Sequence, residues 1–205
     1  MYLTHVVFAS LVAAAIAEET GTHTDAWKTV SQNETFYLMY RSYEYDAGTG
    51  GTGKCVSVKL CNKNDATRTA TSRLMYRDAQ TTQLKGFTAR VTMARSWNST
   101  VDDIIRLGDA DNCDASANAA TAEYRLVYSD YSSCDVMVVF GTPEPRCELW
   151  IKDGKQNIED NSRDNDTDNI KNNITKCKKE YDNLCKVKYQ IYDRDICSSP
   201  MKWPH

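Results

Sequence analysis

Two neighbouring segments decide how this chain folds: CDVMVV at residues 134–139 and CELWI at residues 147–151. Both are rich in β-branched and other apolar residues, which is typical of β-strands. Side chains alternate between the two faces of a strand, so Asp135 and Glu148 each point away from the face of the cysteine that precedes them.

The direction of these two acids depends on what the cysteines bind. If the cysteines bond to something packed outside a sheet, Asp135 and Glu148 point inward among apolar and aromatic side chains. A buried charge is costly unless it is paired, so such a pocket favours a cationic ligand. In the alternative interpretation the acids face solvent and the cysteines are only structural. The residues of the two segments leave both interpretations open.

Working outward, eight strand-like segments separated by hairpin-length connections precede a change of pattern near residue 153. This arrangement predicts an all-β domain, an antiparallel barrel or sandwich. An eight-stranded barrel is just large enough to enclose one small ligand. The predicted strands are residues 34–46, 54–62, 68–78, 84–95, 100–107, 120–130, 134–141 and 146–153.

Two helices are predicted at the ends of this β-region. Asp25 is suited to cap a short helical turn over residues 25–30. After a polar loop at about 154–167, apolar residues spaced 4, 3, 4 and 3 apart predict a helix over about 168–188, capped by Thr167 or Asp168 and packed outside the sheet. If Cys134 bonds to a cysteine of this stripe, Asp135 is forced into the barrel. The stripe consists of Ile170, Ile174, Cys177, Tyr181 and Leu184.

Composition indicates a secreted protein of one domain. The chain has 205 residues and a net charge of −3, which gives no basic footprint for nucleic acid. The apolar run at residues 6–17 is too short to span a bilayer and predicts a signal peptide (1–17) cleaved after Ala17, followed by one domain over 18–205. No later segment reads as a membrane anchor.

The eight cysteines of the mature chain suggest four disulfides in an oxidising environment. Four glycosylation sequons are also present, each a candidate surface glycan site in a secreted protein. They begin at Asn33, Asn98, Asn165 and Asn173.

The distribution of histidines argues against several kinds of catalysis. The three histidines are His5 in the predicted signal peptide, His23 near the mature N-terminus and His205 at the end. Sites with a histidine base or histidine metal ligands are therefore not expected. A hydrolase that uses a carboxylate pair is compatible with the residue types alone. We expect a protein that is not an enzyme and that has no metal or cofactor.

The ordered set of motifs resembles the tick salivary lipocalins, in particular the histamine-binding proteins. The resemblance spans nearly the whole mature chain, although the general Gly-x-Trp signature of lipocalins is absent. It implies an eight-stranded antiparallel lipocalin-type barrel at about 34–153, a short N-terminal helix, a helix on the outside of the barrel and a disulfide-tied C-terminal tail. The motifs are Asp25-Ala26-Trp27, Tyr43, Asp46, Cys55-Val56, Tyr128-Ser129-Asp130, Cys134-Asp135-Val136, Glu148-Leu149-Trp150, Cys177 and Cys197.

The resemblance also implies two disulfides, Cys55–Cys197 and Cys134–Cys177. Of the remaining cysteines, Cys147 points outward by strand alternation and Cys185 follows the apolar stripe, so we pair them. This leaves Cys61–Cys113.

In the resembled proteins one amine site uses the acids that match Asp135 and Glu148, beside Trp150 in this chain. A second site uses a tyrosine and an aspartate that match Tyr43 and Asp46. That site also needs a glutamate on the fourth strand and a tryptophan in the first hairpin loop. Here the strand position is Ala89 and the loop has no tryptophan, so we expect the second site to be impaired.

The positions of two further groups bear on the ligand. Glu123 or Tyr124 replaces another acid that the chain lacks. Alternation places Arg41 on the same face of its predicted strand as Met39 and Tyr43. If Tyr43 faces the barrel interior, Arg41 does too, unless a strand bulge turns it outward. An inward Arg41 either neutralises the acids or binds the carboxylate of a fatty acid or eicosanoid.

The sequence therefore predicts a secreted, monomeric carrier that sequesters a biogenic amine, histamine or serotonin, and suppresses the host inflammatory response. Carboxylates hold the ammonium through charge-assisted hydrogen bonds, and aromatic rings surround the rest of the ligand. One alternative is an eicosanoid or fatty-acid binder that uses Arg41. Another is a protein that binds a host protein such as a complement component on its outer surface. No nucleic acid or membrane partner is expected.

Overall fold

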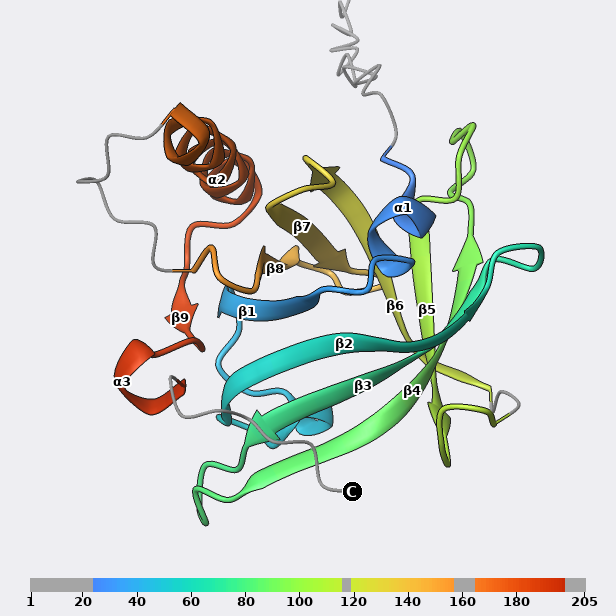
Figure 1. Ribbon diagram of the computed structural model, residues 1–205, viewed down its shortest axis with the longest axis horizontal. Helices are drawn as coiled ribbons and strands as arrows, with labels where there is room; N and C mark the ends of the chain where they lie inside the picture. The colour runs from blue at the N-terminus through green and yellow to red at the C-terminus, as the bar shows by residue number, and fades with distance from the viewer. Residues whose placement is uncertain (1–23, 116–118, 157–164, 198–205) are drawn as a thin grey trace, which may run out of the picture.

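The structure is a computed structural model, and it describes residues 24–115, 119–156 and 165–197 (Figure 1). The predicted signal peptide, most of the predicted loop before the last helix and the C-terminal tail beyond Cys197 lie outside the described residues. Among the helices in the described ranges, none is long and apolar enough to span a lipid bilayer.

Eight antiparallel strands close into a barrel, as the sequence predicted (Figure 1). Each strand pairs with the next in the chain, and β1 closes the barrel because it pairs with both β8 and β2. The strands are β1 (Thr35–Arg41), β2 (Lys54–Asn64), β3 (Thr69–Arg77), β4 (Leu84–Ala94), β5 (Ile104–Ala110), β6 (Ala120–Ser129), β7 (Cys134–Val139) and β8 (Arg146–Lys152).

The first predicted strand is shorter than expected. It ends at Arg41, and the following loop contains a 3-10 helix, η1 (Ala47–Thr49). The Asp46 side chain caps η1 by accepting a hydrogen bond of 2.9 Å from the Gly48 amide, which favours a turn over an extended chain.

The fifth strand begins later than predicted, at Ile104. The carboxylate of the buried residue Asp103 accepts hydrogen bonds from the amide and the hydroxyl of Ser96, at 2.7 and 2.6 Å. These bonds fold the preceding segment into a compact loop instead of a strand.

The short N-terminal helix α1 (Ala26–Val30) closes one end of the barrel. The Asp25 carboxylate accepts a hydrogen bond of 3.1 Å from the Trp27 amide, as expected of an N-cap. Trp27 packs in an apolar cluster with inward-facing residues of the barrel strands, among them Val91 and Ile105. The position of α1 at the barrel end is visible in Figure 1.

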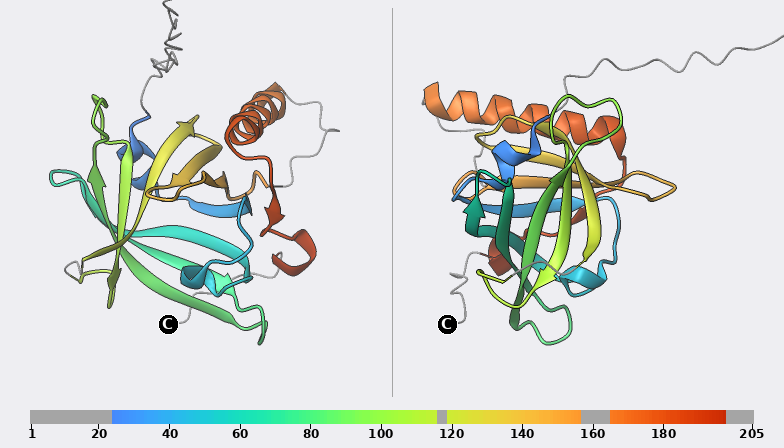
Figure 2. Two further views of the ribbon diagram at one scale, coloured as in Figure 1. Left: turned by 180° about the vertical axis from the view of Figure 1, so that it is seen from behind. Right: turned by 90° about the vertical axis from the view of Figure 1, so that its right-hand side faces the viewer.

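The long helix α2 (Asn165–Leu184) lies on the outer side of β7 and β8, as Figures 1 and 2 show. It begins three residues before the predicted start at 168. Ile174, Cys177 and Tyr181 of the predicted stripe are buried against the barrel, but Leu184 is 44% exposed. Cys185 is buried instead, because the next contact falls one full turn after Tyr181.

Four disulfides fasten the outer elements to the barrel, and they are the four expected pairs. Cys134–Cys177 and Cys147–Cys185 join α2 to β7 and β8. Cys55–Cys197 joins the short helix α3 (Arg194–Cys197) to β2. Cys61–Cys113 joins β2 to the loop after β5. A two-residue strand, β9 (Tyr189–Gln190), pairs with the end of β1.

Candidate functional site

The barrel encloses a cavity of about 110 Å³. A single water needs roughly 10–15 Å³ of such volume, so the cavity has room for several waters or one small organic molecule. Its wall is mostly apolar, with Phe36, Leu74, Val91, Ile105 and Met137 among the residues that line it. Polar groups reach the cavity at a few positions only, and these decide what the cavity binds.

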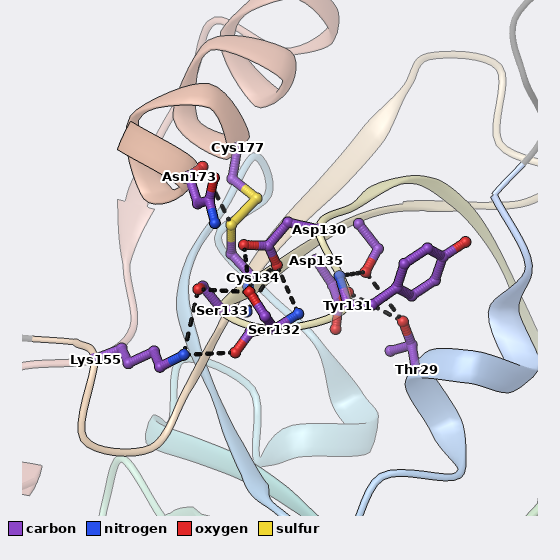
Figure 3. Close-up of a disulfide and its surroundings, with 11 residues drawn as sticks. Thr29, Asp130, Tyr131, Ser132, Ser133, Cys134, Asp135, Lys155, Asn173 and Cys177 are labelled. Carbon is purple, nitrogen blue, oxygen red and sulfur yellow. Dashed lines mark hydrogen bonds between the residues drawn. A yellow bond between two sulfur atoms is a disulfide. The ribbon is translucent and has the colours of Figure 1, made fainter. Parts of the chain in front are cut away.

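Asp135 points into this cavity, as expected for the case in which Cys134 bonds to a residue outside the barrel. Cys134 faces the opposite way and bonds to Cys177 of α2 on the outside of the barrel (Figure 3). The Asp135 side chain is almost completely buried, with 1% of its surface exposed. The disulfide therefore orients the acid beside it.

The carboxylate of Asp135 is surrounded by hydroxyl groups. It accepts a hydrogen bond of 3.2 Å from Thr29 at the end of α1, and a second from Ser129 of β6. Among the described residues no lysine or arginine forms an ion pair with it. Burial raises the pKa of Asp135 to about 7, against the opposing effect of the two hydroxyls. The group therefore changes its protonation near neutral pH.

Glu148 also points into the cavity, from β8, and is 3% exposed. The indole Nε1 of Trp150 donates a hydrogen bond of 2.9 Å to one carboxylate oxygen, and the Tyr43 hydroxyl donates to the other. Burial raises the pKa of Glu148, while these two donors and the charge of Arg41 lower it. Its carboxylate is thus satisfied by the chain itself.

The two acids lie close together on adjacent strands. Asp135 is paired across β7 and β8 with Trp150, and Glu148 is paired with Met137. They are diagonal neighbours on the inner face, with Cα atoms roughly 7–8 Å apart. The cavity therefore carries two carboxyl groups that come from neighbouring positions on its inner face.

Arg41 is inside the barrel, but for a different reason from the one expected. The pairing of β1 with β8 shifts between Leu38 and Tyr40, which marks a bulge. Met39 and Tyr40 both pack on the outside, where the Tyr40 ring contacts Tyr181 of α2 at a centroid distance of 4.8 Å. The expectation that Arg41 shares a face with Met39 is wrong, and the bulge turns Arg41 inward rather than outward.

The guanidinium of Arg41 is fully buried, and its N–H groups donate to the loop between β1 and β2. It is absent from the cavity wall in the described structure. With four hydrogen bonds of 2.6–3.0 Å it has little capacity left for a ligand carboxylate. The acceptors are the carbonyl oxygens of Tyr43, Glu44 and Gly51 and the hydroxyl of Thr49.

Asp46 lines the cavity beside this cluster, and its side chain is 20% exposed. Its carboxylate lies 3.6 Å from Nη1 of Arg41, so the chain supplies a cation to this acid. Ala89 is buried on β4, on the same face as the cavity-lining Val91, and places no acid there.

Tyr124, not Glu123, faces the cavity from β6. Glu123 lies on the outer face, where its carboxylate accepts a hydrogen bond of 2.7 Å from Arg106. Thr29 and Ser129 were not assigned a role from the sequence. Ser129 belongs to a motif that carries the resemblance, whereas nothing in the sequence placed Thr29 beside Asp135.

Comparisons with known proteins concern the family and the fold of this chain. The profile of the family described as "Tick histamine binding protein" matches residues 15–199. The male-specific histamine-binding salivary protein of Rhipicephalus appendiculatus is 29% identical over 140 residues, which is 66% of this chain and 66% of that protein.

Two solved structures share the lipocalin-type barrel. Japanin of Rhipicephalus appendiculatus, bound to cholesterol, has 13% identity over 80% of this chain and 95% of that chain, with a TM-score of 0.51. The amine-binding protein of Rhodnius prolixus, in complex with tryptamine, has 10% identity over 91% and 94%, also with a TM-score of 0.51. At these identities the likeness concerns the fold.

Proposed function

This chain belongs to the family of tick histamine-binding proteins, and we propose that it is a secreted carrier that sequesters a small biogenic amine, histamine or serotonin, in its barrel. Removal of such a mediator from host tissue suppresses the inflammatory response. The histamine-binding relative and the amine-binding protein of the same fold support this class of ligand.

The observation that carries the proposal is the environment of Asp135. A fully buried carboxylate is costly without a cation, and its neighbours here are the hydroxyls of Thr29 and Ser129. An ammonium placed beside Asp135 supplies the missing charge through charge-assisted hydrogen bonds. The hydroxyls rotate freely enough to accept from the ammonium once it is present.

The rest of the cavity fits the remainder of such a ligand. Trp150 and Phe36 line the wall and offer aromatic and apolar contact to a ring. Glu148 lies diagonally from Asp135 and is already bonded to Tyr43 and Trp150, so it suits a hydrogen bond from a ring N–H or hydroxyl. A molecule with an ammonium at one end and a polar ring at the other can place its ammonium at Asp135 and its ring at Glu148.

The lipid alternative is less well supported. Its proposed anchor, Arg41, is engaged by the carbonyls and hydroxyl of its own loop. A fatty acid in the cavity would bring a third carboxyl group beside Asp135 and Glu148.

Calorimetric titration of the secreted protein at pH 8 with histamine, serotonin and arachidonate tests the proposal. We expect amine binding, and Asp135→Asn should weaken it by about 1.5–3 kcal/mol, the scale of a hydrogen bond to a charged group. Glu123→Gln is the matched control, because it makes the same chemical change on the outer face of β6 and should alter affinity less than twofold.

Binding of arachidonate and not of amines would replace the proposed function with the lipid alternative. Absence of all small-ligand binding would leave recognition of a host protein as the better hypothesis.

A further inference from the structure

The charges of this protein are unevenly distributed over its barrel. Strands β2, β3 and β4 contain seven basic residues (three, two and two) and no acidic residue, although the whole chain has a net charge of −3. The carboxylates of the cavity lie elsewhere, on β7, on β8 and in the segments on either side of β1. One wall of the barrel is therefore strongly basic.

Strand register places five of these seven cations on the outer face, and the other two, Lys63 and Lys85, lie opposite inner-face residues of β3. On β3 the inward residues Ser72 and Leu74 line the cavity, so Arg73 and Arg77 point outward. Lys59 is directly opposite Arg73, and Lys54 is directly opposite Arg77. Like charges in directly opposed positions destabilise an antiparallel pair, yet β2 and β3 contain two such pairs.

The row continues onto the next strand. Arg90 of β4 is opposite Thr71, so it is the diagonal neighbour of Arg73. The Nε atoms of Arg77 and Arg90 are buried and have no hydrogen-bond partner among the described residues. We call the outward residues Lys59, Arg73, Arg77 and Arg90 the basic wall.

We propose that the basic wall binds a sulfated polysaccharide of the extracellular matrix. Adjacent strands are about 4.8 Å apart, so the row presents a narrow line of cations to a linear polyanion. Threonines flank it, with Thr88 directly opposite Arg73. An anionic membrane fits less well, because membrane binding needs apolar anchors and none of the large exposed apolar residues in the described structure lies on β2, β3 or β4.

The basic wall is independent of the cavity. It occupies the outer face of β2–β4, whereas α2 covers β7 and β8 elsewhere on the barrel (Figures 1 and 2). Polysaccharide binding on the outside and amine binding on the inside are therefore compatible in one molecule. Such binding retains the carrier near the cells that release its ligand.

Affinity for immobilised heparin at 0.15 M NaCl tests the proposal. The double variant Arg73→Gln/Arg90→Gln should lose at least tenfold in affinity, and wild-type binding should weaken steeply with added salt. The control Lys178→Gln/Lys179→Gln removes two exposed charges from α2 and should change affinity less than threefold. Urea denaturation of each variant checks that the fold is intact, independently of any ligand in the cavity.

The proposal is overturned if the wild-type protein does not bind heparin, or if the α2 control loses as much affinity as the double variant. Equal binding to fully desulfated heparin would show that the basic wall does not recognise sulfate groups and would also overturn the proposal. Tighter binding to phosphatidylserine vesicles than to heparin would assign the surface to a membrane instead.

Discussion

Asp135 and Glu148 are both almost fully buried, face one cavity and lie on adjacent strands, yet the protein treats them differently. Glu148 receives hydrogen bonds from Tyr43 and Trp150, with the charge of Arg41 nearby. Within the described residues, Asp135 receives hydrogen bonds from the hydroxyls of Thr29 and Ser129 and has no cationic partner.

The contrast teaches that burial alone does not identify a ligand-binding acid. What distinguishes the two groups is how far their own chain satisfies them. Burial and the negative charge of Glu148 raise the pKa of Tyr43, so this phenol stays protonated and remains a donor to Glu148. At the other acid, the most favourable partner is a cation from outside the protein.

Removing Arg41 tests how much the chain's own groups stabilise the acids on the Glu148 side of the cavity. We expect this substitution to have the largest effect on stability. Arg41→Met leaves Asp46 without its cationic partner and three loop carbonyls without their donor, so the free energy of unfolding should fall by roughly 3–5 kcal/mol. Urea denaturation measures this. Arg106→Met removes an exposed ion pair with Glu123 and should cost only about 0–1 kcal/mol. Similar losses in the two variants would show that the Arg41 cluster contributes no special stability.

Neutralising Asp135 tests the opposite expectation, that this acid destabilises the unliganded protein when it is ionised. Its pKa is about 7 in the folded state and 3.8 ordinarily, so its contribution to stability is fully present below about pH 4 and is lost as pH rises to about 7. Asp135→Asn should therefore stabilise the unliganded protein at pH 8, on the order of 2–4 kcal/mol, and should change little at pH 4.

Urea denaturation of wild type and variant at the two pH values measures this difference. Glu148→Gln should give a smaller gain, because its carboxylate loses strong bonds to Tyr43 and Trp150. An Asp135→Asn variant that is less stable than wild type at pH 8 contradicts the environment described for this acid.

The pH dependence of binding gives the smallest expected effect. If the amine binds only ionised Asp135, affinity for serotonin should fall about tenfold between pH 8 and pH 6, because the pKa of the free site is about 7. The ammonium itself, like a lysine, stays charged over this range. Calorimetric titrations at several pH values measure the profile. Equal affinity at both pH values would show that Asp135 is not the titrating partner.

Much of the fold was predictable because regular strands preserve alternation. The register of β7 and β8 runs without a shift, so the residues beside Cys134 and Cys147 face inward as expected. On β1 a bulge interrupts alternation between Leu38 and Tyr40. Arg41 therefore points inward, but not for the predicted reason that it shares a face with Met39. A bulge inserts one residue without a clear sequence signature, so alternation cannot be carried across it.

The sequence determined the eight strands and the outer helix with its stripe, because these follow from local periodicity. It also determined that each acid points away from the cysteine beside it, so the direction of the acids followed once the partners of the cysteines were known. It also contained the motifs of the family. Only the tertiary structure decided which acid is satisfied by the chain. Thr29 reaches Asp135 across 106 positions and Tyr43 reaches Glu148 across 105, whereas Ser129 is the directly paired neighbour of Asp135 on β6. The electrostatic cost of a buried carboxylate depends on all groups within a few ångströms, and of these groups Thr29 and Tyr43 come from segments that only the folded barrel brings to the acids.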